Sequence, residues 1–353
     1  MVKLHTRILV SFVLFSIKHT DGQDQTLLFT GSNPSSPPGF NLPTGNQQCT
    51  CVPQGSCQRF SSSSPLIDIR IVNMGTFCTP GFEYCCDGTG GNVIDGTCGL
   101  RKIPATPQPT GQASYGAYPW QAALLTTSNN YIGSGVLINS NHVLTVAHKV
   151  AAYRNGGFKV RLGEWDARST TEQYPYQEYQ VARLFIHPNF NSQNLQNDVA
   201  VIRLASNVPI SSSPNINTAC LPNSMPSPQT RCWVSGWGKN AFGSSGSYQS
   251  IMKEVDVPIL SQTTCETQLR GTRLGQFFVL DRNSFLCAGG EMGKDACTGD
   301  GGSPLVCQNG FGAFQVVGMV AWGIGCATAG VPGIYINVVN FLSWINQQVT
   351  QMV

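Results

Sequence analysis

The chain has 353 residues, of which only 11% are charged, and its formal net charge is +3. So small a charge, with no cluster of lysine or arginine, argues against nucleic acid as the main partner. The length suggests about two domains, and the 38 glycines and 21 prolines indicate a loop-rich, mostly β protein.

Residues 1–22 have the pattern of a secretory signal peptide. Lys3 and Arg7 precede the apolar run Ile8–Ile17, and cleavage is expected near Gly22. The run is shorter than the ~20 apolar residues that span a bilayer. No later segment is long and apolar enough to span. We therefore expect a secreted protein without a transmembrane segment, whose 14 cysteines form disulfides.

The remaining chain divides by composition into four segments. Residues 23–48 are polar and rich in Gly, Ser and Pro, which predicts disorder. Residues 49–86 form a small cysteine-dense module, and residues 87–112 form a linker that contains Cys98. From 113 to 353, short β-type runs alternate with Gly-rich turns, which predicts a barrel or sandwich. Apolar residues at near-helical spacing in Phe341–Val349 predict a C-terminal helix.

Three motifs carry the chemistry of acyl transfer, in the order histidine, aspartate, Gly-rich turn. They are VLTVAH (Val143–His148), NDVAVIRL (Asn197–Leu204) and DACTGDGGSPLVC (Asp295–Cys307). Together with PWQAAL, CWVSGWG, VAWGIGC and GIYINV, they resemble the chymotrypsin/trypsin family over Tyr118–Ile345. The resemblance implies an all-β fold of two packed six-stranded antiparallel barrels. The site would lie in the cleft between them.

The resemblance assigns His148 as the general base and Asp198 as the acid that orients it. The family turn Gly-Asp-Ser-Gly-Gly-Pro is here GDGGSP (Gly299–Pro304), so Gly301 stands at the nucleophile position. Loss of that serine costs on the order of 10⁶ in kcat. The oxyanion-hole remnant, the amides of Gly299 and Gly301, would retain only about 10³–10⁴ over water. We therefore predict that the chain is not an enzyme.

An alternative is an active hydrolase that uses Ser303, two residues downstream of Gly301. Two residues displace an atom by roughly 6–7 Å, whereas proton transfer needs heavy atoms within about 3.2 Å. We expect Ser303 not to substitute for the missing nucleophile.

Other departures from the family pattern agree with a loss of activity. Ala321 stands where the family has a serine that supports the buried aspartate. Lys149 and Ile132 stand where the family pairs two cysteines. No family-type Ile-Val-Gly-Gly terminus stands in register ahead of Trp120, and the possible cleavage site Lys102-Ile103 is out of register. Asp300 is therefore expected to lack the ammonium partner that zymogen cleavage supplies, which predicts a zymogen-like or differently locked cleft.

The family's substrate pocket is better preserved. Asp295 matches the aspartate that selects basic side chains, and Gly323 and Gly333 match the glycines of the pocket wall. A decoy or adhesive protein that binds basic peptides there is an alternative function. No cofactor is expected to be required. Calcium is a weak candidate ligand for Glu164, Asp166, Glu172 and Glu178, against the alternative of a solvated acidic loop.

The cysteine-dense module resembles the clip domain of arthropod immune proteases. The resemblance rests on the spacing of six cysteines: Cys49, Cys51, Cys57, Cys78, Cys85 and Cys86. Sequence alone would allow fifteen pairings of them. The resemblance implies Cys49–Cys85, Cys51–Cys78 and Cys57–Cys86 in this module. It further implies Cys232–Cys307, Cys265–Cys287 and Cys297–Cys326 in the protease-like domain, with Cys98–Cys220 as the tether between linker and domain.

Arg70-Ile71, in the long loop of the clip-like module, matches the specificity of a trypsin-like enzyme. We hypothesise that cleavage after Arg70 switches the protein; an ordinary exposed arginine is the alternative. The resemblance implies a clip-domain serine protease homologue of arthropod haemolymph, a cofactor or regulator of prophenoloxidase activation and melanisation. Expected partners are an activating clip protease, prophenoloxidase or other homologues, with oligomerisation possible after cleavage.

Overall fold

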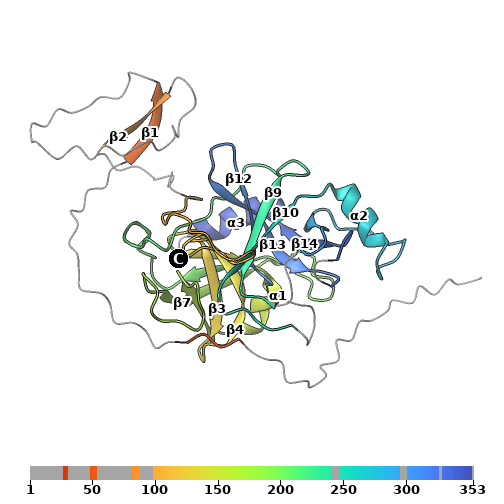
Figure 1. Ribbon diagram of the computed structural model, residues 1–353, viewed down its shortest axis with the longest axis horizontal. Coiled ribbons are helices and arrows are strands. Elements are labelled where there is room, and N and C mark those ends of the chain that lie inside the picture. The colour runs from red at the N-terminus through yellow and green to blue at the C-terminus, as the bar shows by residue number, and fades with distance from the viewer. Residues whose placement is uncertain are drawn as a thin grey trace, which may run out of the picture.

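The computed structural model describes residues 27–30, 98–239, 246–294, 300–325 and 328–351, and the backbone of 48–53 and 82–87 (Figure 1). Several predicted features lie outside these ranges: the signal peptide 1–22, the Arg70-Ile71 junction, the Cys297–Cys326 bond, and the pairing of the clip cysteines. In the clip-like module, β1 (Gln48–Pro53) and β2 (Phe82–Asp87) pair as an antiparallel two-stranded sheet.

The first barrel closes in the order β3-β4-β5-β8-β7-β6. Its strands are β3 (Gln121–Thr126), β4 (Tyr131–Asn139), β5 (His142–Thr145), β6 (Phe158–Leu162), β7 (Gln177–Ile186) and β8 (Ala200–Leu204). The short helix α1 (Ala147–Val150) and the 3₁₀ turn Ala151–Tyr153 follow β5, and a second 3₁₀ turn, Ile210–Ser212, follows β8. Valine, isoleucine and leucine side chains fill the interior of this barrel. Such side chains pack well on the buried face of a pleated strand.

The second sheet has the order β10-β9-β12-β13-β14-β11. Its strands are β9 (Arg231–Gly236), β10 (Lys253–Pro258), β11 (Phe285–Gly289), β12 (Pro304–Gln308), β13 (Phe314–Trp322) and β14 (Pro332–Asn337). An Ile259–Ala288 bridge and a bond from Leu260 N to Cys287 O bring the two edge strands together. The predicted pair of six-stranded antiparallel barrels is confirmed.

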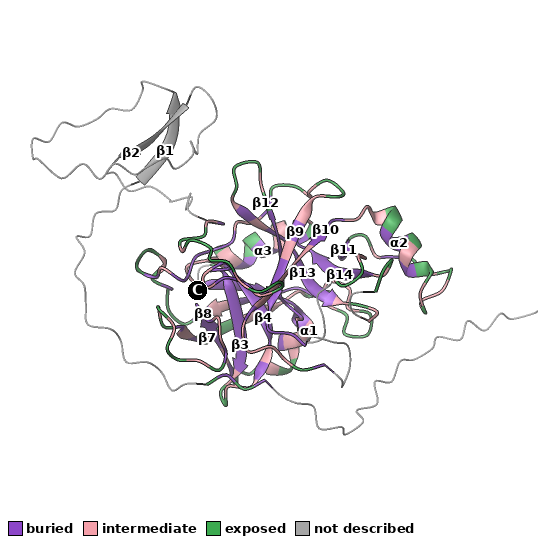
Figure 2. Cartoon of the chain, viewed as in Figure 1, coloured by how far each residue is buried: buried purple, intermediate pink, exposed green. Residues whose placement is uncertain are grey.

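Two longer helices cover the second sheet and its junction with the first. α2 (Gln262–Arg270) begins at Ser261, whose hydroxyl accepts a bond from Thr264 N, as an N-cap residue does. α3 (Val338–Thr350) confirms the predicted C-terminal helix and buries Phe341 and Ile345 in the core. Figure 2 shows the buried residues concentrated along the barrel strands. No helix among the described residues is long and apolar enough to cross a membrane.

Three of the expected disulfides are present: Cys98–Cys220, Cys232–Cys307 and Cys265–Cys287. The tether Cys98–Cys220 joins the linker to the protease-like domain, as predicted. The described part of the linker also packs on that domain. Lys102 Nζ donates to the carbonyl oxygens of Ser213 (3.2 Å) and Ile216 (2.9 Å), which ties down the residue of the possible Lys102-Ile103 cleavage site.

The expectation of disorder throughout residues 23–48 is wrong for Leu27–Thr30. This four-residue segment lies against the first barrel, where it is drawn in red (Figure 1). Leu27 and Phe29 are buried, and Leu28 forms an antiparallel bridge with Asn130, just before β4. Two buried apolar side chains and backbone pairing supply the contacts that the polar composition around them does not suggest.

Candidate functional site

The histidine and aspartate of the predicted triad lie together. His148 is in α1, directly after β5, and Asp198 lies two residues before β8; β5 pairs with β8 through Thr145 and Ala200. Asp198 is fully buried. Its carboxylate accepts a bond from His148 N at 2.7 Å and one from His148 Nδ1 at 2.6 Å. These two bonds fix the imidazole ring and direct its other nitrogen, Nε2, outward, which is the arrangement of a triad base.

Gly301 lies opposite that nitrogen. A Cβ atom placed on Gly301 would be 3.2 Å from His148 Nε2. The prediction that Gly301 occupies the nucleophile position is therefore consistent with the geometry. The φ angle of Gly301 is outside the left-handed region, so the backbone itself would accept a side chain at this position.

Lys149 fills the space that the serine side chain would need. The Cβ position of Gly301 falls 3.4 Å from Lys149 Nζ and is in contact with Lys149 Cε. Burial lowers the pKa of Lys149, while the negative charges of Asp300 and Asp198 act in the opposite direction. The site thus places a buried amine next to His148, within the electrostatic influence of the Asp300 and Asp198 carboxylates. Sequence reasoning missed this role, although the lysine in a family cysteine position was a visible signal.

The assignment of Ile132 to the family cysteine position that pairs with position 149 is wrong. A Cβ atom on Gly133, not on Ile132, would lie against the side chain of Lys149, 3.1 Å from its Cγ. Ile132 packs instead with the hydrophobic core of the first barrel. Alternate residues of a strand point to opposite faces, so a shift of one residue moves the predicted partner to the wrong face of β4.

The turn that follows Gly301 is closely packed against β4 and β5. Gly302 has φ +84°, a conformation that favours glycine. A Cβ atom there would contact the carbonyl oxygen of Ser134 and approach Thr145 Oγ1 at 2.7 Å. Ser134 N also donates to Gly301 O at 3.1 Å. The turn is therefore held by β4 and tolerates no side chain at Gly302.

Asp300 and Ser303 both lie against the end of β9, near Gly236. Gly238 N donates to Asp300 Oδ1 at 2.9 Å. A Cβ atom on Gly236 would lie 2.6 Å from Asp300 Oδ1 and 2.8 Å from Ser303 Oγ. Ser303 is fully buried, so a substrate cannot reach its hydroxyl. This geometry disfavours the alternative in which Ser303 replaces the nucleophile.

The remaining predicted residues of the cleft are only partly described. Ala321 is buried at the end of β13, next to Trp322. Gly323 follows β13 and Gly333 lies in β14, two strands that pair antiparallel. Asp295 and the oxyanion-hole residue Gly299 lie outside the described residues. The binding of basic side chains therefore stays a prediction.

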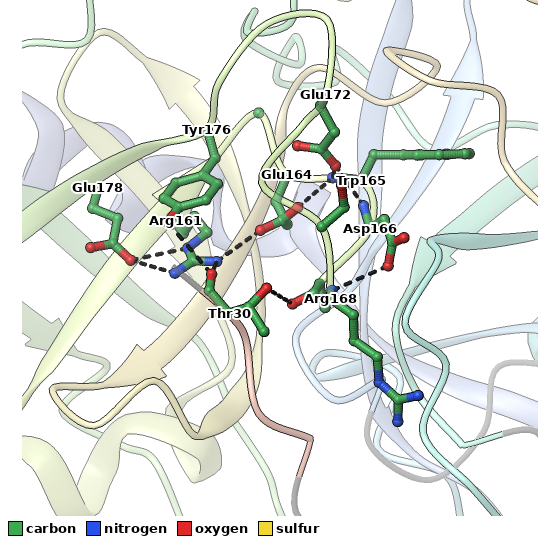
Figure 3. A network of polar contacts seen from close by, with 12 residues as sticks. Thr30, Arg161, Glu164, Trp165, Asp166, Arg168, Glu172, Tyr176 and Glu178 are labelled. Atoms are coloured by element: carbon green, nitrogen blue, oxygen red, sulfur yellow. Dashed lines mark hydrogen bonds and ion pairs between the residues drawn. The ribbon is translucent and has the colours of Figure 1, made fainter. Parts of the chain in front are cut away.

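Of the four candidate calcium ligands, Glu178 lies apart from the other three, on the opposite side of Arg161 from Glu164 (Figure 3). Glu178 binds Arg161 and Lys159, each at 2.8 Å, and Glu164 binds the opposite edge of Arg161 at 2.8 Å. The Arg161 guanidinium therefore supplies the positive charge between two of the carboxylates. Within the described ranges, no group of three or more His, Cys, Asp or Glu side chains could hold a metal ion. Calcium binding by these residues stays a prediction.

Glu164 and Glu172 form a second part of this network. Glu172 accepts bonds from the backbone nitrogens of Trp165 (3.2 Å) and Asp166 (2.7 Å). Burial, with the neighbouring charge of Glu172, raises the pKa of Glu164 to about 8, against the effect of Arg161. Two neighbouring carboxyl groups therefore lie close together in this loop, and calcium binding there stays a prediction.

Comparison with known proteins agrees with this geometry. The trypsin family profile matches residues 109–345. An inactive CLIP domain-containing serine protease A3 of Aedes aegypti is 49% identical, over 88% of this chain and 69% of its own length. Phenoloxidase-activating factor 2 of Galleria mellonella is 45% identical, over 68% of this chain and 82% of its own.

A third relative, the inactive CLIP domain-containing serine protease A8 of Anopheles gambiae, is 39% identical over 76% of this chain and 78% of its own length. Two of these three relatives are named inactive. These similarities agree with the pair of barrels, the His148–Asp198 geometry and the glycine opposite the histidine. The chain belongs to the trypsin family and, within it, to the clip-domain serine protease homologues.

Proposed function

We propose that this protein is a secreted, non-catalytic regulator of an extracellular immune protease cascade, the one that activates prophenoloxidase and leads to melanisation. The observation that carries the non-catalytic part is Lys149. Its side chain fills the nucleophile position beside an otherwise complete His148–Asp198 pair. A triad without its serine loses on the order of 10⁶ in kcat.

The place in a cascade is supported by the relatives. One is named a phenoloxidase-activating factor, and two are named inactive clip proteases. Two intact barrels with a blocked site provide a stable surface for protein partners: an activating clip protease, prophenoloxidase, or another homologue. The disulfides fit secretion into an oxidising compartment. The sequence permits either positive or negative regulation.

Cleavage after Arg70 is the proposed switch. Arg70 lies in the clip-like module. At the other candidate junction, Lys102-Ile103, the lysine side chain is bound to three backbone carbonyls. An upstream trypsin-like protease should therefore cut at Arg70. Oligomerisation after this cleavage is part of the proposal.

Reconstitution tests the function directly. Cut and uncut protein would each be added to the activating protease and prophenoloxidase, with phenoloxidase activity as the readout. We expect the cut form to change activity and Arg70→Gln, treated with the same protease, to behave as uncut protein. The matched control Lys102→Gln should be cut and act as the unmodified chain. N-terminal sequencing identifies the junction, and a sole new terminus elsewhere rejects Arg70 as the switch.

The decoy or adhesive alternative makes a different prediction. It requires that Asp295 bind a basic side chain of the partner. Asp295→Ala should then abolish partner capture, measured by pull-down with the cut protein. Unchanged capture would remove the pocket from the function and leave the barrel surface as the binding element.

A further inference from the structure

The segment Leu27–Thr30, here called the N-terminal strap, pairs with the first barrel through an isolated antiparallel bridge between Leu28 and Asn130. Its side chains alternate: Leu27 is 3% exposed, Leu28 53% and Phe29 1%. Tyr131 N donates to Leu27 O at 3.0 Å, and Phe29 N donates to Asn129 O at 3.2 Å. These are the backbone pairing and the side-chain alternation of an extended peptide, here beside the start of β4.

An aromatic groove receives Phe29. Its ring stacks on Tyr131, with 5.6 Å between centroids, and meets the edge of Trp237 at 5.5 Å. The guanidinium carbon of Arg161 lies 5.4 Å from the Phe29 centroid. Trp237 and Arg161 are both fully buried. Without the strap, this groove would present aromatic surface and a buried guanidinium to water.

The strap also completes the polar network of Figure 3. Thr30 O accepts a bond from Arg161 Nη1 at 3.2 Å, and Thr30 N donates to Ala167 O at 2.9 Å. The ring of Tyr176 covers the same guanidinium, whose central carbon lies 3.8 Å from the ring centroid. A buried guanidinium needs partners for its N–H groups, and the strap supplies one of them.

Tyr131 and Trp237, the two aromatic residues that contact Phe29, are each linked to the nucleophile turn through one further residue. Tyr131 Oη is 2.7 Å from Ser134 Oγ, and Ser134 N binds Gly301 O. Trp237 precedes Gly238, whose N–H binds Asp300 Oδ1 at 2.9 Å. The strap therefore packs against Tyr131 of β4 and against Trp237, which directly follows β9. Each of these residues adjoins a residue that binds the turn Asp300–Ser303.

We propose that the N-terminal strap is a docking peptide built into the chain, and that the groove of Tyr131, Arg161, Ala167 and Trp237 is its binding site. Its occupancy positions the turn at Gly301 from the N-terminal end of the protein. Because the clip-like module lies between Thr30 and Cys98 in sequence, the protease-like domain holds the module at both ends. The strap provides one attachment and Cys98–Cys220 the other.

A disulfide trap in the full chain tests the docking. Leu28 and Asn130 are direct partners in the antiparallel bridge, and paired positions of this kind have Cα atoms ~4.5–5.5 Å apart. Leu28→Cys/Asn130→Cys should cross-link spontaneously, as shown by peptide mapping. The shifted pair Leu28→Cys/Ser128→Cys should cross-link much less. Equal cross-linking of the two pairs, or none in the first, overturns the docking.

Hydrogen exchange tests the effect on the turn. Phe29→Ala should accelerate exchange of the Ser134 and Ser303 amides by at least about tenfold, as local opening becomes easier. Leu28→Ala, the matched control with an exposed side chain, should leave both amides within about twofold. Equal exchange in the two variants overturns the positioning role. Should Phe29→Ala not fold, Phe29→Leu keeps an apolar side chain and should give an intermediate acceleration.

The outcome is independent of the proposed cascade function. Phenoloxidase activation can fail with the trap formed and the exchange difference present. Conversely, a missing cross-link would reject the strap and leave the role of a blocked protease homologue untouched.

Discussion

The two sides of the pseudo-active site differ in what they have kept. On the first barrel, His148 and Asp198 retain both bonds that orient a catalytic imidazole. On the second, the turn keeps Gly302 and Asp300, but Gly301 has no side chain and Lys149 fills the gap. The bonds to His148 hold together β5, α1 and β8, so they contribute to the fold without catalysis. A serine hydroxyl contributes only to the chemistry, which explains why one side persists and the other does not.

The adjacent glycines of the turn should separate packing from chemistry most strongly. Gly302→Ala places a methyl group against Ser134 O at a left-handed φ, which we expect to cost about 2–5 kcal/mol. Gly301→Ala requires the end of the flexible Lys149 side chain to move and His148 Nε2, 3.2 Å from the new Cβ, to shift slightly. It should cost under about 1 kcal/mol. Urea unfolding at constant m-value measures both. Similar losses would mean that the two positions are equally constrained.

A disulfide within the first barrel, beside the Gly301 turn, is the next test. Gly133→Cys/Lys149→Cys should form the bond that the family has and close a loop of about 16 residues, for which chain entropy predicts roughly 3 kcal/mol. The gain should be smaller, because a Cβ atom on Gly133 lies 2.8 Å from Gly301 O. Thiol titration and denaturant unfolding provide the measurements. In the control Ile132→Cys/Lys149→Cys, the new cysteines should stay reduced; a bond there would restore the original assignment of Ile132.

The buried amine should give the site a pH dependence. Because the pKa of Lys149 is lowered from 10.5 in the folded state, the unfolded chain binds more protons between the lowered pKa and 10.5. The stability contributed by Lys149 therefore rises with pH across that window, by at most ~1.4 kcal/mol per unit. Unfolding free energies of wild type and Lys149→Met, measured from pH 7 to 10.5, should diverge in this direction. Parallel curves would show that Lys149 is hydrated.

Sequence motifs predicted the base side of the site completely and the nucleophile side in part. The sequences around His148 and Asp198 are local and specific, so their contact followed from strand order. The side-chain direction of Lys149 depends on three segments that meet only in the folded protein. The register of β4 also required the structure. Ile132 and Gly133 are consecutive residues, and a shift of one residue moves a side chain to the other face of the strand.

The N-terminal strap shows a different limit. Its four residues, LLFT, are too few for a periodic pattern to be recognised within a polar stretch. Its binding depends on Tyr131, Arg161 and Trp237, which come from separate strands and loops. Composition describes what a segment can bury alone, and the strap buries its side chains against another part of the chain.

Restoring the missing hydroxyl should have the smallest effect. In Gly301→Ser, the new Cβ must displace Lys149, and its position relative to His148 Nε2 is adequate only if the lysine leaves. We expect no rise in kcat/KM for an arginine ester and no labelling by a serine-directed phosphonate. Gly301→Ser/Lys149→Ala should label more than the single variant, because it vacates the space beside His148. Robust hydrolysis by Gly301→Ser alone would show that the lysine does not block the site, and that the missing serine was its single defect.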